Sequence, residues 1–310
     1  MKLFDLHADT GYAVMKKRRA GEVDIITRDQ LPKRCAGGFQ WVCMASYFEG
    51  QESWEDMQEM ILALHEENDR CPQVHAVKTK EDLQQEDGLY AIYTVEGMCG
   101  IREDVQSKID WLFAHDIKIA SLAWNDENAL ATGVRGNPER GLSDLGRQVI
   151  SRMGKHHMIV DVSHANEQTF WDIMDCASGP VMATHSNARA LCDHPRNLYD
   201  EQLKELAKRG GIIGVVACGA FVNQDPQKRD VAHLVEHMIY LRDLIGIEHV
   251  ALGLDFMDDY DDSENFMLND LRTPAHAQRI IEGMKHHFTA EEIKAIAYDN
   301  AYRLIKQSCL

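Results

Sequence analysis

Short apolar segments rich in β-branched residues alternate with helical patterns along this 310-residue chain, and this alternation limits the possible folds more than any other feature. The segments are almost continuously hydrophobic, which is typical of strands covered on both faces in a parallel sheet. There are eight such segments, at residues 3–7, 39–48, 89–96, 118–124, 158–164, 180–185, 211–217 and 249–255.

Helical patterns lie between these segments. Apolar residues recur at every third or fourth position over 54–64, 101–112 and 231–245, and Thr289 with Glu292 fits a capping box that begins a last helix. Eight alternations of strand and helix predict a (β/α)₈ TIM barrel, with an open doubly wound sheet as the alternative from pattern alone. Because no Pro-, Gly- or Ser-rich stretch divides the chain, we expect residues 1–310 to form a single barrel domain.

Composition excludes several classes of protein. Fifty acidic side chains against 33 basic ones give a formal net charge of −17, which argues against a nucleic-acid partner. The sequence has no apolar run long enough to cross a bilayer and no secretory signal, so we expect no membrane association. The eight cysteines are scattered without close pairs, which favours reduced thiols in a cytoplasmic protein.

Polar residues end five of the eight apolar segments, and in a TIM barrel the active site is built at the C-terminal ends of the strands. A single histidine at a strand end is more often a structural residue than a ligand, but five coincidences favour a metal site. The chemistry of the group suits Zn²⁺ better than Mg²⁺ or Ca²⁺, which prefer oxygen ligands. The residues concerned are His7, Asp9, Glu96, His164, His185 and Asp255.

One catalytic zinc ion usually takes three protein ligands and a water, so five ligands are more than one ion needs. Two ions that share a bridging carboxylate are the natural arrangement, and Glu96 is the candidate bridge. Asp255 then remains free to accept and return a proton during hydrolysis.

The order and spacing of these motifs resemble the membrane (renal) dipeptidase family of zinc peptidases, and the resemblance runs from His7 to about residue 270. It implies a (β/α)₈ barrel with two zinc ions, one held by His7 and Asp9, the other by His164 and His185. The motifs are His7-x-Asp9, Val-Glu96-Gly97, Asp-Val-Ser-His164, Thr-His185-Ser186, Arg196-Asn197 and Gly-Leu-Asp255-Phe.

The resemblance also assigns roles to residues that do not bind metal. It implies that Glu96 bridges the ions, that Asp255 is the proton shuttle and that Arg196 binds the free carboxylate of a dipeptide, a task suited to a guanidinium group. The alternative for Arg196 is a charge on the surface that caps a helix. A homodimer is a further expectation from the family.

The chain departs from the family after the fourth predicted strand. Mammalian members carry a substrate-binding histidine there, whereas this chain has Trp124 in the stretch Ala-Trp-Asn-Asp. An indole offers one donor and no acceptor, so we expect Trp124 to line the substrate site and to alter the substrate class more than the metal site. The secretion signal and lipid-anchor tail of the mammalian members are also expected to be absent.

The leading hypothesis is therefore a cytoplasmic binuclear zinc dipeptidase that cleaves small dipeptides with a metal-bridging hydroxide. The alternative is another metal-dependent amidohydrolase or lactonase on the same barrel without a preference for dipeptides. A third hypothesis is a metal-binding assembly module without catalysis. The acidic segment 257–264 after Asp255 is interpreted as a solvated loop.

Overall fold

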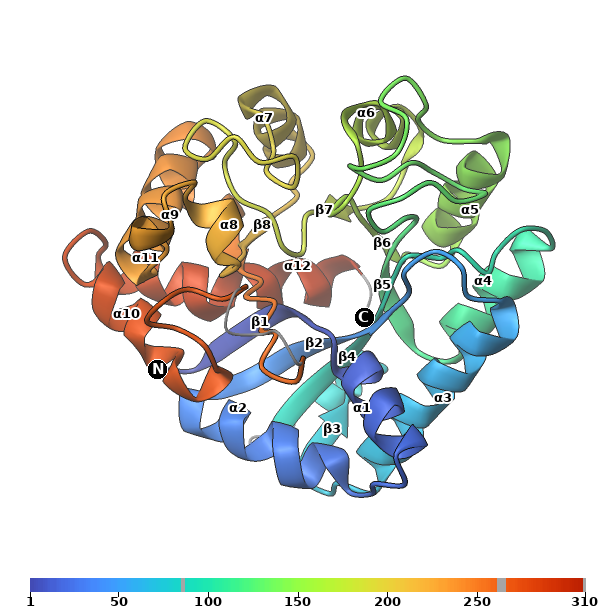
Figure 1. The fold of residues 1–310 in the computed structure, drawn as a ribbon, viewed down its shortest axis with the longest axis horizontal. Coiled ribbons are helices and arrows are strands. Elements are labelled where there is room, and N and C mark those ends of the chain that lie inside the picture. Colours follow the sequence, from blue (N-terminus) through green and yellow to red (C-terminus); the bar gives the residue numbers. More distant parts are fainter. Residues whose placement is uncertain (85–86, 261–265, 309–310) are drawn as a thin grey trace.

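The computed structural model describes residues 1–84, 87–260 and 266–308. Parallel strands surround a central axis and helices cover their outer side (Figure 1). All eight predicted segments overlap a strand of this sheet, whose order is β7-β6-β5-β4-β2-β1-β9-β8. These strands are β1 (Leu3–Ala8), β2 (Phe39–Tyr47), β4 (Leu89–Glu96), β5 (Ile117–Ser121), β6 (Ile159–Asp161), β7 (Val181–Met182), β8 (Ile213–Val215) and β9 (Val250–Leu252).

The two ends of this order, β7 and β8, meet and close the barrel. Ala183 forms a parallel bridge with Ile213, and the Gly214 amide donates a hydrogen bond to the Ala183 carbonyl at 2.8 Å. The closure requires a glycine at position 253, since a Cβ atom there would lie 1.7 Å from the Thr184 carbonyl oxygen. The predicted (β/α)₈ barrel is thus confirmed, and the open doubly wound alternative is wrong.

One strand was not predicted. The short strand β3 (Val74–Ala76) pairs with the first half of β4 and lies outside the barrel order. It has three residues, and His75 and Ala76 are partly exposed, so it lacks the apolar run that identifies the other strands.

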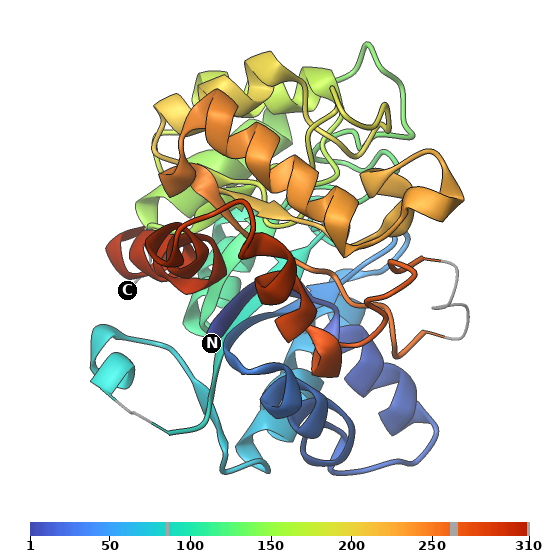
Figure 2. The ribbon, with the colours of Figure 1, turned by 90° about the vertical axis from the view of Figure 1, so that its left-hand side faces the viewer.

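The helices lie around the barrel and connect successive strands (Figures 1 and 2). Their bounds are α1 (Thr10–Arg19), α2 (Leu31–Gly37), α3 (Trp54–Asp69), α4 (Val105–Ala114), α5 (Asp144–Lys155), α6 (Glu167–Cys176), α7 (Asp200–Lys208), α8 (Gly219–Val222), α9 (Val231–Ile245), α10 (Gln278–Met284), α11 (Ala290–Lys294) and α12 (Asn300–Ser308). Shorter 3₁₀ or π segments are Ile26–Gln30, Lys80–Gln84, Pro226–Lys228, Ile247–His249, Pro274–His276 and Ala295–Asp299.

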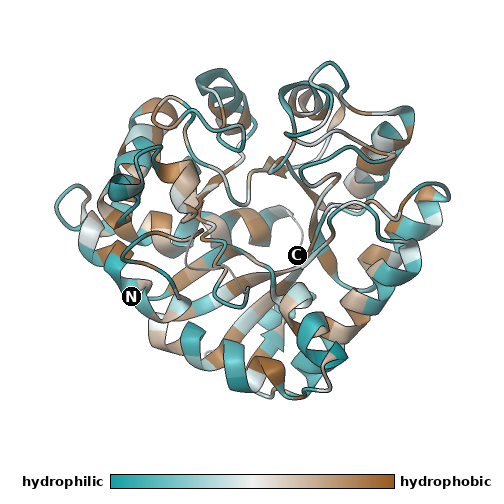
Figure 3. Cartoon of the chain, in the orientation of Figure 1, coloured by the Kyte–Doolittle hydropathy of each residue, from teal (hydrophilic) through white to brown (hydrophobic). Residues whose placement is uncertain are grey.

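The predicted helical patterns correspond to α3, α4 and α9, although α4 begins at Val105, four residues later than the pattern. The capping box at Thr289 is confirmed: its Oγ1 accepts the Glu292 amide at 3.2 Å, and Glu292 accepts the Thr289 amide at 2.8 Å. Hydrophobic and hydrophilic residues alternate along the helices (Figure 3), as expected when one face of each helix packs on the sheet. Among the described residues, no helix combines the length and the apolar character that a bilayer span requires.

The C-terminal helix α12 closes the N-terminal end of the barrel. Ala301, Leu304 and Ile305 belong to the same buried cluster as Phe4 and Leu6 of β1, and Figure 2 shows α12 beside the start of the chain. Apolar side chains therefore fill this end of the barrel. Polar groups gather at the opposite end, where the strands finish.

Candidate metal centre

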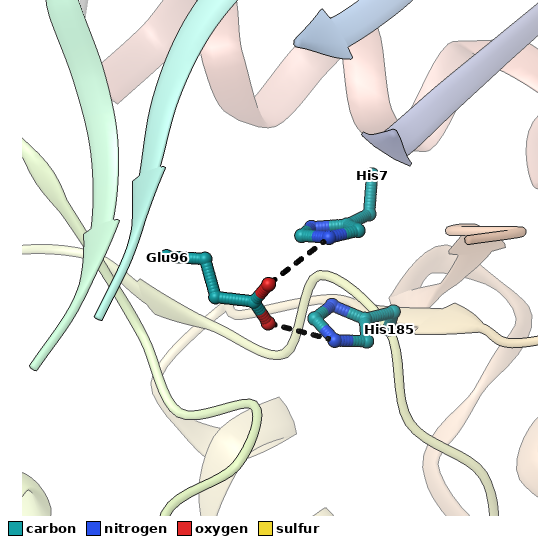
Figure 4. Close-up of side chains that lie close together, drawn as sticks. All are labelled: His7, Glu96 and His185. Carbon is teal, nitrogen blue, oxygen red and sulfur yellow. Dashed lines mark ion pairs between the residues drawn. The ribbon is translucent and has the colours of Figure 1, made fainter. Parts of the chain in front are cut away.

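The five predicted metal ligands meet at the C-terminal end of the barrel. Each side chain is almost fully buried, with at most 9% of its residue surface exposed. In Figure 4 the Glu96 carboxylate, at the end of β4, lies between the rings of His7 and His185. The five residues are His7, Asp9, Glu96, His164 and His185.

The two oxygens of Glu96 face different histidines. Its Oε2 lies 3.6 Å from His7 Nε2, whereas its Oε1 lies 2.7 Å from His164 Nε2 and 3.2 Å from His185 Nε2. The two Nε2 atoms of His164 and His185 are 3.0 Å apart. Glu96 is thus placed between two groups of ligands, as a bridging carboxylate would be.

Neighbouring side chains fix which ring nitrogen of His185 carries the proton. Asp161 Oδ2 accepts the hydroxyl proton of Thr184 at 2.5 Å, so the Thr184 oxygen accepts from His185 Nδ1 at 2.8 Å. His185 Nε2 is then a bare acceptor that points at Glu96.

The same holds for His164, through a different partner. Its Nδ1 lies 2.8 Å from Asn125 Oδ1, an atom that can only accept a hydrogen bond, so Nδ1 carries the proton and Nε2 is bare. Hydrogen bonds to the second ring nitrogen of this kind orient most metal-ligating histidines in proteins.

Three bare acceptor atoms therefore converge with no hydrogen between them. Glu96 Oε1 is buried and makes no hydrogen bond within the described part of the chain, although two imidazole nitrogens lie beside it. Lone pairs at such distances repel each other unless a cation lies among them. The donor set fits a zinc-like divalent ion.

A second group of ligand atoms lies on the other side of His7. His7 Nε2 is 3.2 Å from Asp9 Oδ1 and 3.8 Å from Asp255 Oδ1. Ligand atoms of His7, Asp9 and Asp255 all lie within 4.8 Å of one another, and so do those of His7, Glu96 and His185. The cluster therefore contains two overlapping groups of three possible ligands, which share His7.

The protonation states of His164, His185 and Glu96 agree with this geometry, whereas the Glu96 and Asp9 carboxylates outweigh burial and raise the pKa of His7 well above its usual range. Burial lowers the pKa of His164 to about 4 and also lowers that of His185, so both rings are neutral at pH 7. Burial alone would raise the pKa of Glu96, but His164 and His7 outweigh it and hold that pKa well below its usual range. Neutral imidazoles and an ionised carboxylate are the forms that bind metal.

The backbone is strained at two of these positions. His164 and Asp255 both have positive φ values, of 69° and 54°, which are uncommon for residues other than glycine. Gly97, directly after Glu96, has a φ of 79°, and a Cβ atom there would lie 2.8 Å from the Phe48 carbonyl oxygen. Strain of this kind concentrates at functional sites, where it aims a side chain into the centre.

Asp255 lies beside the ligands with one oxygen free. Its Oδ1 is buried and accepts no hydrogen bond from any described residue. Burial, together with the Asp9 and Glu96 carboxylates, raises the pKa of Asp255 to about 7. A carboxylate with that pKa can both accept and release a proton near neutral pH.

Arg196 is buried near the same cluster, so the alternative of a helix-capping charge on the surface is wrong. Its Nη2 donates to the His185 carbonyl at 3.2 Å, and its guanidinium carbon lies 5.6 Å from the Phe221 ring centroid. The Nε proton of Arg196 has no acceptor among the described residues. A buried, incompletely paired guanidinium is well suited to bind an incoming carboxylate.

Trp124 lies at the edge of the centre. Its ring centroid is 5.8 Å from that of His164 and 5.1 Å from that of Tyr47, and the Arg135 guanidinium lies 4.9 Å from it on a more exposed side. The indole therefore lies beside one of the predicted metal ligands, and its role in lining the substrate site stays a prediction.

The sequence prediction missed the residues that orient the ligands. Asp161 and Thr184 stand within motifs that the prediction quoted, so their hydrogen bonds to His185 could have been proposed from strand geometry. Asn125 follows Trp124, and nothing in the sequence indicates that it contacts His164. Tyr260, whose hydroxyl donates to Asp9 Oδ2 at 2.9 Å, lies in the segment interpreted as a solvated loop.

Comparison with known proteins gives relatives that match different fractions of this chain. A protein from Klebsiella pneumoniae described as an uncharacterized protein in the pqqA 5′ region is 37% identical over 169 residues, which are 52% of this chain and 61% of that protein. Dipeptidase tcpJ of Claviceps purpurea (strain 20.1) is 39% identical over 116 residues, which are 37% of this chain and 27% of that protein. The chain thus spans about six tenths or less of the length of these relatives.

A solved structure shares the fold over nearly the full length. The crystal structure of a metallo peptidase from Rhodobacter sphaeroides, liganded with a phosphinate mimic of the dipeptide L-Ala-D-Ala, covers 99% of both chains with a TM-score of 0.86 and 20% identity. The family described as membrane dipeptidase, peptidase family M19, matches residues 1–309. Because this match spans almost all of the sequence, the chain belongs to the membrane dipeptidase family M19.

Proposed function

We propose that this chain is a binuclear zinc dipeptidase that hydrolyses the peptide bond of small dipeptides. The observation that carries the proposal is the convergence of His164 Nε2, His185 Nε2 and Glu96 Oε1 without a proton between them. Two further facts support it: the family of the chain, and the relatives described as a dipeptidase and as a metallo peptidase liganded with a dipeptide mimic.

In this proposal His7 and Asp9 would hold one ion, His164 and His185 would hold the other, and Glu96, which lies between the two groups, would be a ligand of both. If bound there, two zinc ions would supply an activated water as nucleophile and a positive charge to polarise the scissile carbonyl. The buried hydrogen bonds of Asn125 and Thr184 keep two of the imidazoles in the tautomer that a metal needs.

The substrate is held and the proton is moved by residues that do not bind metal. Arg196 binds the free carboxylate of the dipeptide through its unpaired Nε proton. Asp255 Oδ1 accepts the proton that the attacking water loses and then passes it to the nitrogen of the leaving amine. The peptide C–N bond breaks, and a carboxylate and a free amine leave the site.

Trp124 completes the substrate site. The side chain of one substrate residue packs on its indole, because the indole lies beside the predicted ligand His164 and packs against Tyr47. The indole cannot accept a hydrogen bond, so this wall selects substrates by shape and apolar contact.

Trp124 also favours a second candidate function. A metal-dependent amidohydrolase or lactonase on the same barrel needs the metal cluster and Asp255 but no dipeptide carboxylate. In that case the positive charge of Arg196 would only compensate the negative charges of the buried Glu96 and Asp255.

A substrate panel with zinc-loaded protein separates the two functions. Dipeptides of L-L and L-D configuration are compared with N-acyl amino acids and lactones, and metal content is measured on the same sample. The dipeptidase proposal expects about two divalent ions per chain and turnover of at least one dipeptide. Turnover of only the other substrates would favour the second function, and fewer than one ion per chain with no activity on added Zn²⁺ would reject both.

A further inference from the structure

The hydroxyl of Tyr260 contacts a predicted metal ligand. It donates a hydrogen bond to Asp9 Oδ2 at 2.9 Å, while the other oxygen of that carboxylate, Oδ1, lies 3.2 Å from His7 Nε2. One oxygen of Asp9 is therefore occupied by a protein donor. Only Oδ1 remains directed at the metal cluster.

The segment that carries Tyr260 is fixed to the barrel. Lys33 Nζ lies 2.7 Å from Asp258 Oδ2, and Lys17 Nζ lies 3.0 Å from Asp259 Oδ1. These aspartate side chains are only 16% and 14% exposed. The interpretation of a solvated loop is therefore wrong for residues 257–260, and residues 261–264 of that prediction lie outside the described residues.

Further contacts tie the same segment to Gln30, after β1, and to Thr273. Gln30 donates a hydrogen bond to Asp259 Oδ2, and Thr273 Oγ1 donates to Asp258 Oδ2 at 3.3 Å. Lys17 in addition pairs with Asp29 at 2.8 Å. Two lysines and two polar side chains thus neutralise or bind both aspartates, so that the acidic residues serve as anchors for the segment.

The ring of Tyr260 is held as firmly as its backbone. It stacks on Tyr12 of α1 with a centroid distance of 4.9 Å and an interplanar angle of 3°. Because Tyr12 stands three residues after Asp9 on the same continuous stretch of chain, the stack sets the distance between the Tyr260 hydroxyl and Asp9. The hydroxyl has little freedom to turn away from the carboxylate.

We propose that Tyr260 is a positioning residue that acts through Asp9: it restricts Asp9 to binding through a single oxygen and thereby sets the affinity of the ion that His7 and Asp9 hold. This inference rests on the proposed function. Partners of metal-ligating carboxylates orient the ligand, and their loss typically lowers metal affinity by about 10- to 100-fold. In the described part of the chain Tyr260 bonds to Asp9 and not to His164 or His185, so an ion held by those two histidines should keep its affinity.

The test compares Tyr260→Phe with Tyr12→Phe in the full chain. The first variant retains the stacked ring and loses only the hydroxyl at Asp9, while the second removes the hydroxyl of the other ring of the same stack. Zn²⁺ is titrated against a chromophoric chelator, which reports the affinity of each ion without any assay of activity. We expect Tyr260→Phe to weaken one ion by about 10- to 100-fold and Tyr12→Phe to match the wild type. Equal affinities in Tyr260→Phe and the wild type would overturn the inference.

A double-mutant cycle tests whether the effect passes through Asp9. In an Asp9→Ala background, adding Tyr260→Phe should produce no further loss of affinity, because the side chain that the hydroxyl positions is gone. A full additional loss in that background would contradict the inference. The wild-type titration distinguishes failure of the Tyr260 inference from failure of the proposed function. A wild type that binds no Zn²⁺ rejects the proposed function itself.

Discussion

Asp255 shows how one residue combines an unusual backbone with a chemical role. Its φ of 54° aims the side chain at the ligands, its Oδ1 has no described hydrogen-bond partner, and burial raises its pKa to about 7. Asparagine tolerates the same left-handed conformation and has nearly the same shape. The residue can therefore be changed chemically while the fold at this position stays the same.

Asp255→Asn should retain bound metal and lose turnover. An amide cannot take the proton from water, and loss of a general base or acid typically costs about 10²- to 10⁴-fold in rate. Kinetics on the best dipeptide and metal analysis of the same sample test this expectation. A variant with wild-type kcat would show that Asp255 takes no part in the chemistry. Absence of turnover in both the variant and the wild type would instead favour an assembly module.

Arg196→Gln tests recognition of the substrate carboxylate. A charge-assisted hydrogen bond contributes about 1.5 to 3 kcal/mol, so kcat/KM for a dipeptide should fall by about 10- to 100-fold. The matched control is the amide of the same dipeptide, which lacks the free carboxylate and should be hydrolysed equally by both proteins. An equal loss on the dipeptide and its amide would indicate that Arg196 supports the site in another way.

At the residue scale, the sequence predicted the groups that end strands, because strand ends meet at one edge of a barrel whatever the details of the loops. His164 and His185 could be found in this way. Tyr260 could not, since its position depends on lysine pairs with Asp258 and Asp259 that join segments more than 200 residues apart. Such contacts leave no local pattern in a single sequence.

At the scale of elements, the alternation of strand and helix was predictable, but strand lengths were not. The predicted segment 158–164 forms a strand only over Ile159–Asp161, and 180–185 only over Val181–Met182. Beyond those points the chain turns to present its ligands, with a positive φ at His164. Apolar residues continue past the end of each strand because the turn is also buried, so the hydrophobic pattern alone does not mark the end of the strand.

Helix α9 is connected to the loop after β7 by one buried histidine. His237 Nδ1 accepts the Ala188 amide proton at 3.2 Å, and its Nε2 donates to the Val222 carbonyl at 3.0 Å. Both nitrogens are thus used by the neutral ring. Burial accordingly lowers the pKa of His237 to about 4.

This histidine should make stability depend on pH. Its folded pKa lies below the unfolded value of about 6.5, so the unfolded chain binds more protons between those two values. The contribution of His237 is therefore complete above pH 6.5 and is lost as the pH falls toward 4. Between pH 7 and 5 it should cost about 2 kcal/mol in the free energy of unfolding.

Urea unfolding at pH 7 and pH 5, with a chelator present in every sample, measures the effect. His237→Gln has no titrating ring and should lose about 2 kcal/mol less than the wild type between the two pH values. Identical losses in the two proteins would show that His237 does not titrate in this range.

At the scale of the whole molecule, three buried carboxylates lie at one end of the barrel. Asp9, Glu96 and Asp255 are at most 9% exposed, and the buried guanidinium of Arg196 opposes the charges of Glu96 and Asp255. Two bound Zn²⁺ ions would change the formal charge from −17 to −13 at the place where the carboxylates crowd. The predicted cytoplasmic location, the homodimer and the exclusion of nucleic acid stay predictions from sequence.

Removal of metal should lower the stability of the whole fold. A ligand at about 100 times its Kd stabilises a protein by about 2.7 kcal/mol if only the folded state binds it, so a chelator should lower the Tm by several degrees. Added Zn²⁺ should restore the Tm. Glu96→Gln removes the proposed bridge and should respond less to the chelator, and a wild-type Tm that is insensitive to chelation would contradict a metal centre in the barrel.

The most direct test of the central claim is the initial rate of dipeptide hydrolysis by the metal-free protein, measured as Zn²⁺ is added in known equivalents per chain. The account predicts no turnover without metal and a rate that rises until two equivalents are bound, because Glu96 joins two groups of ligands. Absence of dipeptide hydrolysis at every ratio, or a full rate at one equivalent or fewer, would contradict it.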